Sequence, residues 1–351
     1  MKQMETTVTR IYDTLGVKKT RQRLFILVIL LLLLVWVSFF LGRYSISPTT
    51  IVKAIASRFL PLDINWSPTV ETVIFQIRLP RILLALIVGA GLSISGAGFQ
   101  GVFQNPLVGP SILGVSSSAG FGAAFAILMF NSPFLIQVFA LAFGILGVII
   151  AYTISRVYQT APILMLVLSG IVVSAFFSAL ISVTKFVADP YDKLPEITFW
   201  LMGSLGAASL EDLLMVFPPM LIGITGLLLV SWKINILSMG DKEARALGVN
   251  AEFIKIIVIA CATMVTASAV CVSGIIGWVG LIIPHIGRMI VGPDHRILLP
   301  VSLLLGAIFL LLIDDLARTI AAAEIPLGIL TALIGAPFFI YLIRRTKGGW
   351  K

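Results

Sequence analysis

Charged residues are scarce in this sequence, and this scarcity is its most informative feature. Only 12% of its 351 residues are Asp, Glu, Lys or Arg, whereas 59% are hydrophobic, and the mean hydropathy is +1.08. A water-soluble domain carries roughly a quarter charged residues. So few charges cannot cover the surface of a soluble protein of this length, and lipid must therefore be much of its solvent. The composition excludes a soluble globular protein and predicts a membrane protein.

Cysteine and histidine are almost as scarce. Cys261 and Cys271 fall in one predicted helix, where ten residues separate them by about 15 Å along the axis, and this is too far for a disulfide. His285 and His295 have no neighbouring Cys or His at the spacing of metal ligands. We therefore expect no disulfide, no bound metal and no cofactor.

Catalytic motifs are missing as well. The chain lacks a GxxxxGK[ST] phosphate-binding loop, so we expect it not to hydrolyse ATP by that route. No Ser–His–Asp arrangement is suggested, and the apolar runs hold essentially no Asp, Glu or Lys near their centres. Carriers driven by protons or sodium normally keep ionisable groups there. We expect no catalytic residues, and a stand-alone secondary carrier or channel is the alternative function.

Nucleic acid is not an expected partner. The net charge is +9, but the sequence has no basic stripe with interleaved aromatic residues. Most of the positive charge lies at the two ends of the chain and in short loops. This distribution is typical of a membrane protein, whose partner is the lipid bilayer.

Long apolar runs dominate what is present. A helix needs about 20 apolar residues to cross the hydrocarbon core of a bilayer, and such runs recur along the whole chain. They predict an all-α, polytopic membrane protein with about ten transmembrane helices. The predicted spans are 24–42, 79–102, 111–130, 134–155, 161–184, 213–233, 252–272, 274–291, 297–317 and 327–344.

Positive charge predicts the orientation of these spans. With ten crossings, 17 of the 25 Lys and Arg fall on the side of the N-terminus. Because cytoplasmic loops carry the excess of Lys and Arg, both termini are expected in the cytoplasm. The predicted organisation is a cytoplasmic tail at 1–23, a single ten-helix membrane domain at 24–345 and a second cytoplasmic tail at 346–351.

Three connections between spans carry further signals. Residues 43–77 contain a short amphipathic stretch, Pro48–Leu60, and residues 185–212 contain Phe199-Trp200-Leu201-Met202, which we interpret as a short helix at the outer surface. On the inner side, Ser238–Asn250 mixes charges with Ala and Leu at helical spacing. A short surface helix there could insert into a groove on a soluble partner, and an ordinary amphipathic loop is equally compatible.

Three arginines lie on the predicted outer side, against the charge rule. These are Arg78, Arg81 and Arg318. They could extend toward lipid headgroups. They could equally form a cationic docking surface for an acidic partner, since rim charges steer association and fix its register.

Several long motifs in register resemble one known family. The run QIRLPRILLALIVGAGLSISGAGFQGVFQNPLVGPSILGVSSSAG, beginning at Gln76, is similar to the signature of FecCD-type permeases, the membrane subunits of ABC importers for iron–siderophores, haem and cobalamin. The later segments GDKEARALGV, GWVGLIIPHIGRMIVGPDHRILLP, DDLAR and AAAEIPLGILTALIGAPFFIYLIRR agree. The resemblance covers about residues 24–345 in order.

This resemblance implies a bacterial or archaeal cell-membrane protein with ten helices per subunit. It implies a homodimer around a central pathway, two cytoplasmic ATP-binding subunits and one extracytoplasmic substrate-binding protein. A ferric siderophore is the first expectation for the cargo, and cobalamin, haem and molybdate-type oxyanions stay open.

The resemblance also implies roles for individual residues. It favours docking of the binding protein for Arg78, Arg81 and Arg318, and it makes Asn105, Pro106 and Leu107 the cytoplasmic gate. The residues expected to couple the chain to the ATPase are Gly240, Asp241, Glu243, Ala244, Arg245, Leu247 and Gly248.

Overall fold

The computed structural model describes residues 2–61, 66–130, 132–156 and 162–345, and all secondary-structure elements in these ranges are helices. Seven helices in these ranges are long and apolar enough to cross a membrane. They are α1 (Lys2–Phe40), α4 (Leu79–Val102), α6 (Pro133–Ser155), α7 (Ile163–Val187), α9 (Leu210–Leu229), α12 (Ala251–Ser273) and α14 (His295–Thr319).

Three apolar helices are shorter, and the remaining elements are connections. The shorter ones are α5 (Val115–Met129), α13 (Val279–Val291) and α15 (Leu327–Arg345). The connecting elements are α2 (Pro48–Ala56), α3 (Pro68–Thr72), the π-helix η1 (Val73–Arg78), α8 (Lys193–Met202), α10 (Ser231–Leu237) and α11 (Asp241–Ala246).

The predicted helices lie where the apolar runs place them, but three boundaries differ. Helix α1 begins at Lys2 and so extends well before the predicted span that starts at residue 24. The predicted spans 111–130 and 274–291 start too early, because α5 begins at Val115 and α13 at Val279. The predicted tail at 346–351 lies outside the described residues.

Backbone conformation explains the two late starts. Between α4 and α5 the chain leaves the helix at Gln104 (φ 50°) and reaches Gly114 (φ 87°) through a segment with two prolines. Before α13 it passes Gly274 (φ 67°) and Trp278 (φ 69°). Positive φ is incompatible with a right-handed helix, and proline lacks the amide that helices need. Residues 103–110 contain Gln104, Asn105 and two prolines and lie outside the predicted spans, whereas residues 111–114 and 274–278 were included in spans because they are apolar.

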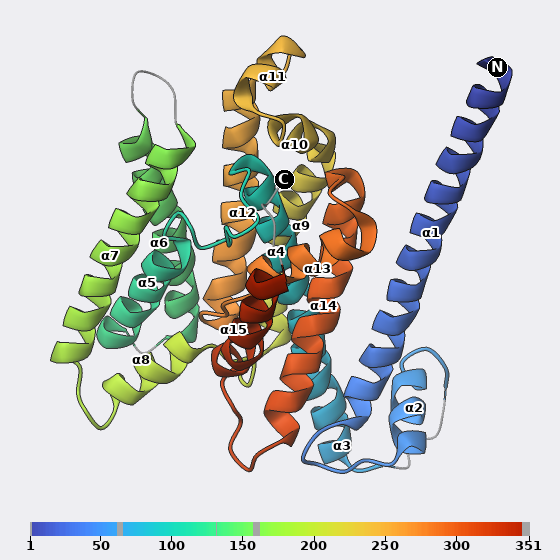
Figure 1. The fold of residues 1–351 in the computed structure, drawn as a ribbon. Helices are drawn as coiled ribbons and strands as arrows, with labels where there is room; N and C mark the ends of the chain where they lie inside the picture. Colours follow the sequence, from blue (N-terminus) through green and yellow to red (C-terminus); the bar gives the residue numbers. More distant parts are fainter. Residues whose placement is uncertain (1, 62–65, 131, 157–161, 346–351) are drawn as a thin grey trace.

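Helix α4 is the centre of the molecule. It packs against α9, α12, α13 and α14, while α5, α6 and α7 form a group on one side, joined to the rest through α12 (Figure 1). Helix α1 lies on the opposite side, along α14. We name the two ends of the bundle from Figure 1: the α11 end carries the start of α1 with α10 and α11, and the α2 end carries α2, α3, α8 and residues 320–326.

Glycines allow α4 to approach its neighbours closely. A Cβ atom on Gly89 would lie 2.3 Å from the carbonyl oxygen of Gly306 in α14, and one on Gly96 would lie 1.8 Å from that of Gly280 in α13. Glycine is therefore required at both crossings, as is common where membrane helices pack backbone to backbone. The crossing at Gly89 and Gly306 holds α14 beside α4, and this position sets the geometry of the site at the α2 end.

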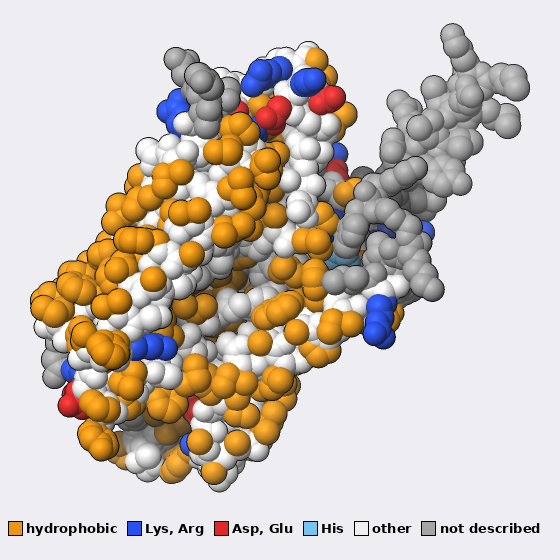
Figure 2. All heavy atoms as spheres, turned by 60° about the vertical axis from the view of Figure 1, so that its left-hand side comes forward, with side chains coloured by type: hydrophobic (Ala, Val, Ile, Leu, Met, Phe, Trp, Pro, Cys, Tyr) orange, Lys and Arg blue, Asp and Glu red, His pale blue; other side chains and the backbone are white. Residues whose placement is uncertain are grey.

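The surface between the two ends is largely apolar. Figure 2 shows hydrophobic side chains over the flank of the bundle, with most of the charged side chains in that view near its ends. Large apolar residues of α7 expose much of their surface, among them Val172 (61% exposed), Phe176 (60%) and Phe186 (89%). An apolar flank with charged ends is what a lipid bilayer requires of a protein that crosses it.

Candidate functional site

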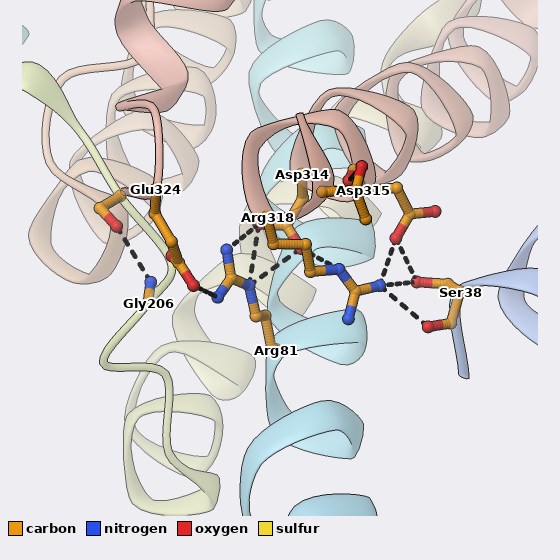
Figure 3. Close-up of polar contacts among 9 residues, drawn as sticks. Ser38, Arg81, Gly206, Asp314, Asp315, Arg318 and Glu324 are labelled. Carbon is orange, nitrogen blue, oxygen red and sulfur yellow. Dashed lines mark hydrogen bonds and ion pairs between the residues drawn. The ribbon is translucent and has the colours of Figure 1, made fainter. Parts of the chain in front are cut away.

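The three predicted docking arginines lie together at the α2 end, and all three are buried. Arg78 is 3% exposed, and Arg81 and Arg318 are each 5% exposed. Arg78 ends η1, Arg81 lies in the first turn of α4, and Arg318 lies in the last turn of α14. The packing of α4 against α14 brings these segments together from distant parts of the sequence (Figure 3).

Arg81 joins α4 to α14 and to the loop that follows α14. Its Nε lies 3.0 Å from both carboxylate oxygens of Asp314, and its Nη2 lies 2.9 Å from Oδ1. Its Nη1 donates to Oε1 of Glu324 at 3.0 Å (Figure 3). The Asp314 side chain is fully buried, whereas that of Glu324 is 35% exposed. Arg81 therefore has one permanent buried partner and one partner at the surface.

Arg318 joins α14 to α1. Its Nη2 donates to the carboxylate of Asp315 and to the carbonyl oxygen of Ser38, the latter at 2.9 Å. The Ser38 hydroxyl donates to Asp315 at 2.7 Å, which closes a buried network (Figure 3). Buried charges are tolerated when they are paired and hydrogen-bonded in this way.

Arg78 differs from the other two arginines because the two hydrogen bonds that it donates both go to backbone carbonyl oxygens. It donates to the carbonyl oxygens of Phe39 and Tyr44, each at 2.5 Å. It therefore fixes the turn after α1, and its guanidinium also lies against Gly42, where a Cβ would be 2.8 Å from Nη2. The chain itself holds all three guanidinium groups, which do not extend outward as isolated surface charges.

These side chains form the walls of a small hollow at the α2 end. Its volume is about 180 Å³, and it is lined by Gly42, Arg43, Tyr44, Val73, Ile77, Arg78, Arg81, Arg318 and Glu324. Arg43 is exposed and lies close enough to donate to the carbonyl oxygen of Ala321 at 3.4 Å. Burial alone would raise the pKa of Glu324, but the hydrogen bond and the charge of Arg81 outweigh it and hold that pKa below its ordinary value.

The predicted gate residues form a compact turn at the opposite end of α4. The amide of Asn105 donates to the carbonyl oxygen of Gln100 at 3.2 Å, and the Asn105 side chain accepts from the amide of Leu107 at 2.9 Å. Asn105 is exposed and Leu107 is 42% exposed, with Pro106 between them. Gln104 donates from its side chain to the carbonyl oxygen of Leu237 at 3.0 Å. This bond ties the turn to the end of α10.

The predicted coupling residues form α11, which projects from the bundle in Figure 1. Gly240 (φ 130°) and Gly248 (φ 76°) bracket it, and both conformations favour glycine. Ala244 is fully buried on its inner face. The outer face is exposed and mixes charge with apolar groups, in Lys242, Glu243, Arg245, Met239 and Leu247.

A buried lysine holds α11 to the bundle. The side chain of Lys255, in the first turn of α12, is 2% exposed. Its Nζ lies 2.5 Å from Asp241 Oδ2 in α11 and 3.5 Å from Glu252 Oε1. From the sequence, Lys255 is one of the 17 positive charges assigned to the side of the N-terminus. Lys255 lies near the start of an apolar run, 14 residues after Asp241. This arrangement was the signal that could have identified the pair.

The structure thus places the predicted docking residues at one end and the gate and coupling residues at the other. The sequence did not identify Ser38, Asp314, Asp315 and Glu324 as partners of the arginines. The adjacent acids Asp314 and Asp315 inside an apolar run were a signal, because such acids need a cation nearby. Among the described residues, no group of three or more His, Cys, Asp or Glu could hold a metal ion.

Comparison with known proteins extends over nearly the whole chain. Residues 14–345 match the FecCD transport family. The molybdate import system permease protein MolB of Haemophilus influenzae is 44% identical over 326 residues, which cover 93% of this chain and 96% of that protein. The cobalamin import system permease protein BtuC of Halobacterium salinarum is 42% identical over 286 residues, covering 81% of this chain and 76% of that protein.

A solved structure is similar over the same extent. A metal-chelate type ABC transporter in an inward-facing conformation gives a TM-score of 0.83 at 43% sequence identity, covering 93% of this chain and 99% of the other. The helical fold in Figure 1 is therefore one already seen in an ABC transporter.

Proposed function

Since the chain belongs to the FecCD transport family, we infer that it is a multi-pass permease subunit of an ABC importer. The observation that carries this function is the match to the family across residues 14–345. The 43% identity to an ABC transporter over 93% of the chain agrees with it. ATP is hydrolysed by separate subunits, and the chain supplies the membrane pathway.

The membrane domain at 24–345 crosses the bilayer ten times, with both termini and the α11 end in the cytoplasm. The seven long apolar helices supply seven crossings, and α5, α13 and α15 supply three. Helix α13 has 13 residues and would alone span about 20 Å. The adjoining irregular segments complete such crossings, which is tolerated at membrane depth where the backbone is buried in protein. The excess of Lys and Arg at the α11 end supports this orientation.

Two copies of the chain enclose the pathway between them. At the cytoplasmic side, each copy presents α11 to one of two ATP-binding subunits through the coupling residues Gly240, Asp241, Glu243, Ala244, Arg245, Leu247 and Gly248. At the opposite side, a substrate-binding protein docks over the hollow formed by Arg78, Arg81 and Arg318. The exposed mixed face of α11 and the arginine-rich walls of the hollow support these two assignments.

The cargo is a metal chelate of the iron–siderophore kind, as the metal-chelate type transporter of similar structure suggests. Relatives of comparable identity import molybdate and cobalamin, so the fold itself does not select the cargo. The binding protein makes that selection. A permease that held the cargo tightly would slow its release.

Two bonds of this chain connect the ATPase contact to the pathway. Movement of α11 reaches α12 through Lys255 and Asp241. Movement of α10, which adjoins α11, reaches the gate at Asn105, Pro106 and Leu107 through the bond between Gln104 and Leu237. Closure of the ATP-binding subunits would thereby shift the gate, as coupling through contiguous packed elements requires.

Uptake of cargo into liposomes tests this function against a stand-alone carrier. We expect uptake only when the chain is reconstituted with its ATP-binding subunits, ATP and loaded binding protein. Omitting the ATP-binding subunits should reduce uptake to the level of empty liposomes. A secondary carrier would instead continue to transport, and sustained uptake driven by a proton or sodium gradient alone would exclude the proposed function.

A further inference from the structure

Glu324 is the carboxylate at the mouth of the arginine-lined hollow. It shares Arg81 with Asp314, but the two acids differ in burial: the Asp314 side chain is fully buried, and that of Glu324 is 35% exposed. Asp315, which pairs with Arg318, is also buried. Glu324 is thus the member of this charge network that water and a docking partner can reach (Figure 3).

The segment that carries Glu324 is held by backbone hydrogen bonds and by the Ile325 side chain, which packs against the hydrophobic core. Residues 320–326 connect α14 to α15, and Ala321, Ala322 and Ala323 precede the glutamate. The amide of Ile325 donates to the carbonyl oxygen of Ala317 at 3.2 Å, and Arg43 reaches the carbonyl oxygen of Ala321. The Glu324 side chain, 35% exposed, can therefore turn from Arg81 into water while Ile325 keeps the segment in place.

The hollow is built for negative charge. Four arginines line it, and Glu324 is the acidic residue among its lining residues. Nη1 of Arg81 is bound by the partly exposed Glu324, while the Nε and Nη2 of the same guanidinium are held by Asp314. If Glu324 moved away, Arg81 would stay in place and present one free donor to the surface. An external carboxylate could then accept a hydrogen bond from Nη1 of Arg81 with the geometry that Glu324 uses.

We propose that Glu324 is an internal substitute for a carboxylate of the binding protein, and that docking exchanges the two on Arg81. This inference rests on the proposed docking at the α2 end and names the chemistry of the contact, an Asp or Glu side chain of the partner. In the undocked protein Glu324 keeps a buried arginine paired. On docking, the incoming carboxylate takes Nη1 of Arg81 and Glu324 turns toward water and Arg43.

Such an exchange makes docking reversible. One charge-assisted hydrogen bond is replaced by another of the same kind, so the net gain on docking is smaller than the strength of the new bond. Glu324 also repels the approaching carboxylate, which slows association at low ionic strength. Glu324 therefore lowers the affinity of the permease for its binding protein.

The test is the affinity of the assembled complex, in detergent, for the binding protein that co-purifies with it from native membranes. Glu324→Gln removes the competing charge and is expected to lower the Kd roughly threefold to tenfold, with the larger effect at low salt. Glu71→Gln is the matched control. It removes a carboxylate at the same end that is paired with an exposed arginine, Arg58, outside the hollow, and should leave the Kd unchanged.

Glu324→Asp provides a second measurement. It keeps the charge but shortens the reach to Arg81, so its Kd is expected between those of the wild type and of Glu324→Gln. An unchanged or raised Kd for Glu324→Gln, with wild type and Glu71→Gln binding alike, would overturn the exchange while leaving docking at this end intact. Failure of the wild-type complex to bind at all would instead overturn the docking proposal, and the exchange with it.

Discussion

Replacing Arg81 with leucine is expected to destabilise the folded protein by about 3–5 kcal/mol, because the buried carboxylate of Asp314 loses its hydrogen-bonded partner and keeps only the Nε of Arg318, 3.7 Å away. The Asp314 side chain is fully enclosed, and Arg81 binds both of its oxygens. Glu324 would lose its partner too, but it can turn to water. The measurement is the thermal unfolding midpoint of the purified protein in detergent, together with the folded yield from membranes.

Two further variants separate this effect from the loss of any positive charge. Arg81→Leu combined with Asp314→Leu removes both members of the pair and should recover most of the stability, since replacing a buried pair by apolar groups is often close to neutral. Arg58→Leu removes an arginine whose pair with Glu71 is exposed on both sides, and should cost less than about 1 kcal/mol. Equal stability of Arg81→Leu and wild type would contradict the structural role of Arg81.

This first result bears on how docking is tested. Replacing Arg78, Arg81 and Arg318 by Glu would remove three groups that the chain itself uses to hold α1, α4 and α14 together. Loss of uptake in such a variant would not distinguish docking from folding. Exposed groups at the mouth of the hollow, Arg43 and Glu324, are the better probes of the partner's contact.

Replacing Lys255 with leucine is expected to uncouple ATP hydrolysis from uptake. The substitution leaves Asp241 without its cation and releases α11 from α12. The ATP-binding subunits should still bind the exposed face of α11 and hydrolyse ATP, but their movement would no longer reach α12. We expect the amount of cargo imported per ATP hydrolysed to fall about tenfold or more, a loss of roughly 1.4 kcal/mol or more of coupling free energy.

Conservative and neighbouring substitutions control for this effect. Lys255→Arg keeps a cation between Asp241 and Glu252 and should retain at least part of the coupling. Lys242→Leu removes an exposed lysine of α11 itself and should leave the ratio of uptake to hydrolysis unchanged. If Lys255→Leu imported as much cargo per ATP as the wild type, the proposed route through α12 would be wrong.

The sequence alone predicted most of the fold, since hydropathy and length are what a bilayer demands of a spanning helix. The ten apolar runs each contain a helix of the structure, and the surface helices α2 and α8 also fall where expected. The polar, proline-containing turn at 104–107 was predicted to lie between spans, but the irregular residues 111–114 and 274–278 were placed inside spans, because they are as apolar as a helix. The chain leaves helical geometry there because of the positive φ angles at Gln104 and Trp278, and hydropathy does not report backbone angles.

The sequence singled out the three arginines of the candidate site but did not indicate that they are buried. The arginines stood out because they broke the charge rule, and that observation said nothing about burial. Their partners Asp314 and Glu324 lie 233 and 243 residues away from Arg81, so only the packing of α14 on α4 brings them together. Long-range pairing of this kind cannot be inferred from spacing along one chain.

The most direct test of the central claim is native mass spectrometry of the complex released from its own membranes in mild detergent. The account predicts an assembly with two copies of this 37.9 kDa chain and two ATP-binding subunits, which gains one binding protein when that protein is supplied. A chain that emerged alone or only with copies of itself, even after gentle crosslinking, would contradict the assignment as an ABC importer subunit.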